Sequence, residues 1–121
     1  MDDPEARELC ESTEADVARV LAAQQGLIGD ATADLLAQTF KALSDPTRVR
    51  IISALLHDEL CVHELAQVVG ASQSAVSHQL RTLREMRLVR FHKEGRHVFY
   101  TLDDDHIYDL FRQELEHVSH Q

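Results

Sequence analysis

The most constraining feature of the chain is the segment CVHELAQVVGASQSAVSHQLRTLREMRLV, which runs from residue 61 to residue 89. It contains two short helical patterns, over residues 62–69 and 72–86, separated by Gly70-Ala71. Ala66 is small enough for a second helix to cross closely, and Gly70 supplies the positive φ that a tight turn needs. Two short helices joined in this way predict a helix-turn-helix.

The second helix of this segment has two different faces. Ser72 is a favourable N-cap, and the apolar face is expected to bury Val76, Leu80 and Leu83. The opposite face carries short polar and basic side chains, which can reach base edges and phosphates in the major groove of DNA. The candidate DNA-binding residues on this helix are Gln73, Ser74, Ser77, His78 and Arg81.

An alternating pattern follows this helix. Residues 88–92 and 97–101 alternate around Lys93-Glu94-Gly95-Arg96, which predicts a two-stranded hairpin with glycine in its turn. Lys93 and Arg96 at the tip suit contact with the neighbouring DNA backbone or minor groove. A helix-turn-helix followed by such a hairpin predicts a winged helix-turn-helix.

Net charge at first argues against a nucleic-acid partner, because the chain carries −9 at pH 7. Residues 72–97, however, contain six basic and two acidic residues, so this window carries +4 and the remainder −13. For contact with phosphates, a local basic patch matters more than the net charge of the whole chain. The alternative is a solvated face without a partner, and charge alone does not choose between them.

The rest of the chain is predicted to be helical, over residues 5–25, from Asp30 or Thr32 to about Ser44, from Asp45-Pro46 onward and over 103–120. The predicted fold class is therefore mainly α with a small β-hairpin. We expect an N-terminal arm or helix over residues 1–30 and a winged helix-turn-helix over residues 31–121, whose C-terminal helix serves dimerisation and metal binding. The acidic N-terminus and the absence of a long apolar run predict a cytoplasmic protein without a membrane partner.

Three stretches, ALSDPTRVRIISALL, ELCVHELAQVVGASQSAVSHQLRTLREMRLV and EGRHVFYTL, closely resemble the ArsR/SmtB family of bacterial metal-responsive repressors. The resemblance covers about residues 32–120. It implies a homodimer built on its N-terminal and C-terminal helices, which occupies double-stranded operator DNA when metal-free. Binding of an inducing ion would release the operator and derepress genes of metal efflux or sequestration. Because the regulatory ligands differ among members, the resemblance does not determine the metal.

The final helix carries candidate metal ligands at both ends. His106 and His117 share a face, but eleven residues of helix span about 16 Å, whereas metal–nitrogen bonds are near 2 Å. If two copies pack antiparallel about a two-fold axis, Asp104 and His106 meet His117 and His120 of the partner subunit. The family's fifth-helix pattern is Asp-x-His followed after ten residues by His-x-x-His or His-x-x-Glu, and these four positions match its first form. The expected dimer contact is the middle of the helix, with Ile107, Leu110, Phe111 and Val118.

One oxygen and three nitrogens suit tetrahedral Zn(II), so zinc is the leading inducer, and Co(II) and Ni(II) are alternatives. A softer second site, for Cd(II) or Pb(II), is implied by family members that bind metal between a Cys-x-Cys and arm cysteines. Here His63 replaces the second cysteine, which leaves a mixed set of Cys10, Cys61, His63 and Glu64. The alternative is that Cys61 is a small buried apolar residue and Cys10 is incidental.

Other functions are also open. A thiol- or persulfide-responsive repressor of the same fold would use Cys10 and Cys61 as its reactive pair. A zinc hydrolase is disfavoured, because catalytic zinc needs an open coordination position beside a general base, and no small organic substrate is expected. A zinc buffer without DNA function would not explain the +4 window. We therefore expect a regulator and not an enzyme.

Overall fold

The structure is a computed structural model, and it describes residues 13–120. Contacts within the chain divide it into two units, residues 1–33 and residues 34–121. Helix α2 (Glu14–Gly26) lies in the first unit, and helix α3 (Asp30–Ala42) begins there. The remaining elements are α4 (Pro46–Leu55), β1 (Leu60–Cys61), α5 (Val62–Val69), α6 (Gln73–Glu85), β2 (Val89–Glu94), β3 (His97–Leu102) and α7 (Asp105–Ser119). None of the helices over residues 13–120 has the length and apolar character that crossing a membrane requires.

Helix α2 begins with a capping box. The Thr13 side chain accepts a hydrogen bond from the Asp16 N–H, and the Asp16 carboxylate accepts one from the Thr13 N–H. Thr13 is extended and α2 begins at Glu14, within the helix predicted over residues 5–25; residues 5–12 of that prediction lie outside the described residues. Hydrogen bonds from Arg19 and then Thr13 lower the pKa of Asp16.

The core of the second unit joins α4, α5, α6 and the sheet. Asp45 caps α4, its side chain accepting from the Arg48 N–H, and Pro46 occupies the first turn, where a missing N–H costs nothing. The side chains that this helix directs inward meet those of α5 and α6, and burial of each large one stabilises the fold by about 1.5–3 kcal/mol. The fully buried side chains are Ile51, Ile52, Leu65, Val76, Leu80, Leu83, Leu88 and Val89.

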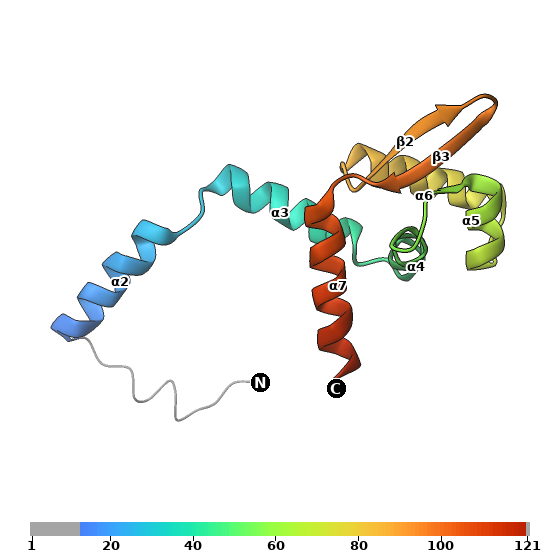
Figure 1. The fold of residues 1–121 in the computed structure, drawn as a ribbon. Helices are drawn as coiled ribbons and strands as arrows, with labels where there is room; N and C mark the ends of the chain where they lie inside the picture. Colours follow the sequence, from blue (N-terminus) through green and yellow to red (C-terminus); the bar gives the residue numbers. More distant parts are fainter. Residues whose placement is uncertain (1–12, 121) are drawn as a thin grey trace. The chain divides into compact units, whose positions relative to one another are not determined.

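The predicted two-stranded hairpin is confirmed as β2–β3, and a short third strand extends it to an antiparallel sheet in the order β1-β3-β2. The added strand, β1, pairs Leu60 with Tyr100 and Cys61 with Phe99. A strand of two residues is too short to show alternation in the sequence, and it runs directly into α5. Figure 1 shows the long β2–β3 hairpin extending from the helices, with α7 starting at the end of β3 away from the hairpin tip.

Candidate nucleic-acid interface and metal centre

The helix-turn-helix is built as its sequence predicts. Gly70 has φ 70°, and the N–H groups of Gly70 and Ala71 both donate to the carbonyl of Ala66. The Ser72 hydroxyl then accepts from the Ala75 N–H at 3.1 Å and starts α6. The left-handed turn thus ends α5 and redirects the chain, so that α6 can cross it.

Helix α6 holds its polar face outward because its other face is fixed in the core. Val76, Leu80 and Leu83 are each 0% exposed. The five residues predicted to bind DNA on this helix are all exposed: Gln73, Ser74, Ser77, His78 and Arg81. Such a face, on a rigidly packed helix, can enter a major groove without rearrangement of the core.

The β2–β3 hairpin carries basic side chains to its tip. Lys93 and Arg96 are exposed on either side of Gly95, which adopts φ 62° in the turn. The guanidinium of Arg84 lies 5.0 Å from the centre of the Phe91 ring, so a cation–π contact links α6 to β2. Arg84 lies in the basic window but is not among the predicted DNA-binding residues, and here its guanidinium packs against the Phe91 ring.

The start of α7 holds half of the predicted metal site. Asp104 is the N-cap: one carboxylate oxygen accepts from the Ile107 N–H at 3.2 Å, and the other lies 3.4 Å from Nδ1 of His106. The hydrogen bond from Ile107, followed by the interaction with His106, lowers the pKa of Asp104. Two ligands bound at about 2.0–2.2 Å around a tetrahedral ion lie about 3.3–3.6 Å apart, so this oxygen–nitrogen separation fits a shared ion.

The other half lies at the opposite end of α7. His117 and His120 are exposed, and the N–H of His120 donates to the carbonyl of His117 in the last turn. The rise of the helix places them about 16 Å from the first half. A single chain therefore brings Asp104 near His106, and His117 near His120, but does not bring the four together.

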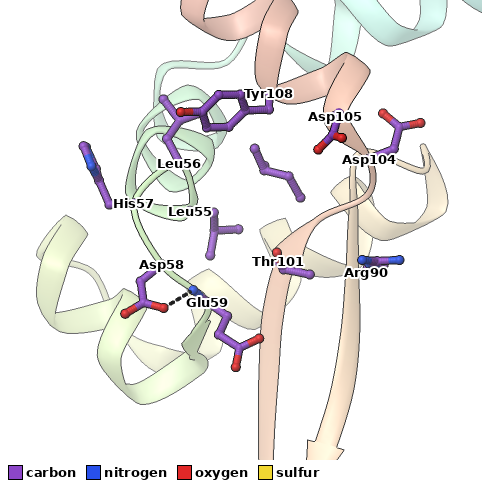
Figure 2. A pocket seen from close by; sticks show the side chains of 11 residues that line it. Leu55, Leu56, His57, Asp58, Glu59, Arg90, Thr101, Asp104, Asp105 and Tyr108 are labelled. Atoms are coloured by element: carbon purple, nitrogen blue, oxygen red, sulfur yellow. Dashed lines mark hydrogen bonds between the residues drawn. The ribbon is translucent and has the colours of Figure 1, made fainter.

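The cavity beside Asp104 is acidic and contains none of the α7 histidines. It has a volume of about 400 Å³. Figure 2 shows Asp104 and Asp105 near its upper rim, with Asp58 and Glu59 lower down and Arg90 to one side. His57 also lines it. This cavity therefore offers carboxylates and the imidazole of His57, whereas His106, whose Nδ1 lies 3.4 Å from Asp104, does not line it.

The candidate second metal site is only partly assembled by the described residues. Glu64 accepts from the Cys61 N–H at 3.0 Å, and its pKa is lowered by this hydrogen bond and by a side-chain contact with Cys61. His63 points elsewhere: its two ring nitrogens lie 3.2 Å from the side-chain nitrogens of Gln67 and Gln73. Cys10 lies outside the described residues. The pairing of Cys61 with Glu64 is that of a helix capping box, which needs no metal.

A further cluster, of Glu59, His92 and Glu94, was not identified from the sequence. Its members come from the loop before β1 and from strand β2, which the sheet brings together. No spacing motif connects positions so far apart, so the only signal available was the acid–histidine alternation within residues 92–94.

Residues 45–90 match the family described as "Bacterial regulatory protein, arsR family". The chain is 41% identical to the transcriptional repressor SmtB homolog of Synechocystis over 92% of its own length and 84% of that protein. It is 38% identical to the cadmium resistance transcriptional regulatory protein CadC homolog of Staphylococcus aureus, over 92% of each chain.

Among solved structures, the homodimeric winged helix-turn-helix DNA-binding domain Mb0332 of Mycobacterium bovis superposes with a TM-score of 0.70 at 27% identity. The match covers 78% of this chain and 94% of that one. The match thus extends to nearly the whole of a domain that pairs with a second copy.

Proposed function

The chain belongs to the ArsR family of metal-responsive, DNA-binding transcriptional repressors, and on that premise we propose that Zn(II) is the ion it senses. As a member of a family of transcriptional regulators it is not an enzyme. In the proposal, the metal-free homodimer occupies operator DNA in the cytoplasm, and zinc binding releases it. The genes freed from repression would serve metal efflux or sequestration.

The observation that carries this proposal is the preorganised pair at the start of α7. Asp104 and His106 stand 3.4 Å apart at their nearest donor atoms, and a matching pair of imidazoles, His117 and His120, ends the same helix. If α7 of a second copy lies antiparallel to the first, each start meets an end. Two equivalent sites result, each with one oxygen and three nitrogens, the donor set that tetrahedral zinc accepts.

The apolar side of α7 supports such a partner. Leu110, Leu115 and Val118 are 37%, 44% and 52% exposed in the single chain. With Phe40, Leu43, Val49, Ile107 and Phe111 they line a groove of about 560 Å³ within residues 34–121. Burial of this surface against a second α7 would remove it from water and bring the histidines at both ends within reach of the other chain.

A short connection links the metal ligands to the reading helix. The N–H of Asp103 donates to the carbonyl of Leu88 at 3.0 Å, and Leu88 follows the end of α6. A shift of Asp104 on metal binding would therefore act on the junction between α6 and β2. The two reading helices must lie about 34 Å apart to occupy both half-sites, so a small change in this frame costs affinity. A coupling of about 1–3 kcal/mol corresponds to about a 5- to 150-fold loss of operator affinity.

The test is an anisotropy titration of labelled upstream DNA with chelator-treated protein, followed by Zn(II). We expect zinc to weaken operator binding at least about tenfold in the wild type. His117→Ala should bind the operator equally well without metal and lose the zinc response. Glu116→Gln, on the same turn, is the matched control and should respond like the wild type. An undiminished zinc response in His117→Ala would refute the site.

The same titration compares inducers. Cd(II), Pb(II), Co(II) and Ni(II), added singly, would show whether another ion releases the operator at lower concentration than zinc. Cys61→Ser distinguishes the second candidate, a thiol-responsive repressor, which is favoured by the partial exposure of this thiol beside the helix-turn-helix. That function requires release by oxidant in chelator-treated protein and loss of this response in Cys61→Ser.

A further inference from the structure

Three donor groups lie close together at the sheet, one from the loop before β1 and two from β2. Oε2 of Glu59 and Oε1 of Glu94 lie 3.5 Å and 3.4 Å from the same atom, Nε2 of His92. All three donor atoms lie within 4.8 Å of one another. The imidazole is held in place because its ring stacks on Phe99 of the neighbouring strand, with 5.8 Å between ring centres.

These separations suit a shared ion better than direct bonds between the side chains. Both exceed the usual N–H···O distance of about 2.7–3.2 Å. Ligands at about 2.0–2.2 Å from a tetrahedral ion lie about 3.3–3.6 Å apart, and both measured separations fall in that range. Two carboxylate oxygens beside one imidazole nitrogen form a donor set that can hold a cation.

Among the described residues, no lysine or arginine is paired with either carboxylate of this cluster. Within residues 13–120, the ion pairs that Glu59 and Glu94 make are those with His92, and neither carboxylate lies within 4.0 Å of a lysine or arginine. The side chains of Glu59, Glu94 and His92 are 40%, 64% and 41% exposed, respectively, so an ion can enter from solvent without opening the core.

We propose that Glu59, His92 and Glu94 form a divalent-cation site on the wing. One imidazole nitrogen and two carboxylate oxygens are suitable donors for Zn(II), Mn(II) or another ion of similar hardness, with water completing the coordination; soft ions that require thiolate are disfavoured. The ion would connect the loop before β1 to strand β2, across β3. This site shares no residue with the donors of α7, so each of the two proposals can be tested without the other.

The experiment uses Mn(II) as the probe, because this paramagnetic ion prefers oxygen and nitrogen to the thiol of Cys61. The full-length chain carries His117→Ala and His120→Ala, which remove the imidazoles at the end of α7. Addition of Mn(II) chloride to the ¹⁵N-labelled, chelator-treated protein should broaden the amide signals of Glu59, His92 and Glu94 first. No DNA is present, so a failure of operator release cannot affect the result.

Variants in the same background decide the assignment. His92→Gln should raise the Mn(II) concentration needed for this broadening at least about tenfold, and Glu94→Gln should raise it in the same direction. His57→Gln is the control, since it removes an exposed histidine two residues from Glu59, outside the cluster. The amide spectrum before metal addition reports the fold of each variant. Broadening that is unchanged by His92→Gln, or that is centred on residues 103–106 and spares the wing, would overturn the proposal.

Discussion

The helix-turn-helix and α7 differ in whether a single chain is enough to form their predicted binding sites. Helix α6 directs three side chains into the core with no exposed surface, and the residues predicted to bind DNA are all exposed on its other side. Helix α7 has no buried residue, and its four predicted ligands are divided between its two ends. The predicted DNA-binding surface of α6 is thus complete in each protomer, whereas the proposed zinc site needs a second copy.

Loss of a core side chain should have the largest effect and separate the two regions most clearly. Leu80→Ala removes a side chain that is fully buried on α6, so we expect a loss of about 2–5 kcal/mol in the free energy of unfolding. Leu115 on α7 is 44% exposed, so Leu115→Ala should lower the free energy of unfolding of the single domain much less. Chemical denaturation followed by circular dichroism measures both.

Protein concentration makes this contrast sharper. If α7 pairs with a second α7, the effect of Leu115→Ala should grow under conditions where the dimer forms, while that of Leu80→Ala should not depend on concentration. If both variants lost the same free energy of unfolding at every protein concentration, the proposed difference between α6, which is complete in one chain, and α7, which needs a partner, would be wrong.

Operator affinity and zinc response should be separable by single substitutions. Arg81→Ala removes an exposed guanidinium from α6, so we expect a loss of about 1–3 kcal/mol in operator binding, with zinc affinity little changed. His120→Ala should do the opposite. Anisotropy with labelled operator and competition with a zinc chelator measure the two quantities. A variant that loses both in parallel would show that the regions are not independent.

Prediction from the sequence succeeded where the signals are local. Gly70, Ser72 and the spacing of Val76, Leu80 and Leu83 all lie within one segment, and each has a direct backbone or packing consequence. Strand β1 was missed because it exists only through its pairing with Phe99 and Tyr100. Asp104, the N-cap of α7, lies one residue after the predicted start of the final helix at residue 103.

The acid–histidine cluster of the wing was beyond sequence reasoning for a different reason. Glu59 and His92 are brought together by the register of the sheet, in which Phe99 of β3 pairs with Cys61 on one side and His92 on the other. Nothing in the linear spacing of the two residues encodes that register. The predicted four-ligand set on α7 stays a prediction, because its four donors meet only if two chains pair.

The smallest difference between the regions concerns the caps of their helices. The Ser72 hydroxyl that caps α6 does not titrate, whereas the Asp104 carboxylate that caps α7 does, and the hydrogen bond from the Ile107 N–H lowers its pKa from the usual 3.8. A lowered pKa means that the folded state favours the carboxylate. The contribution of this cap is therefore complete above the ordinary pKa and is lost as the pH falls through the lowered value.

In metal-free protein, acidification below about pH 4 should therefore shift the Ile107 amide signal and increase its exchange with solvent. The Ala75 amide, which donates to Ser72, should not follow this titration. Asp104→Asn keeps an acceptor at the cap and should abolish the pH dependence at Ile107 while leaving the helix in place. A titration at Ile107 that Asp104→Asn leaves unchanged would show that another group governs the start of α7.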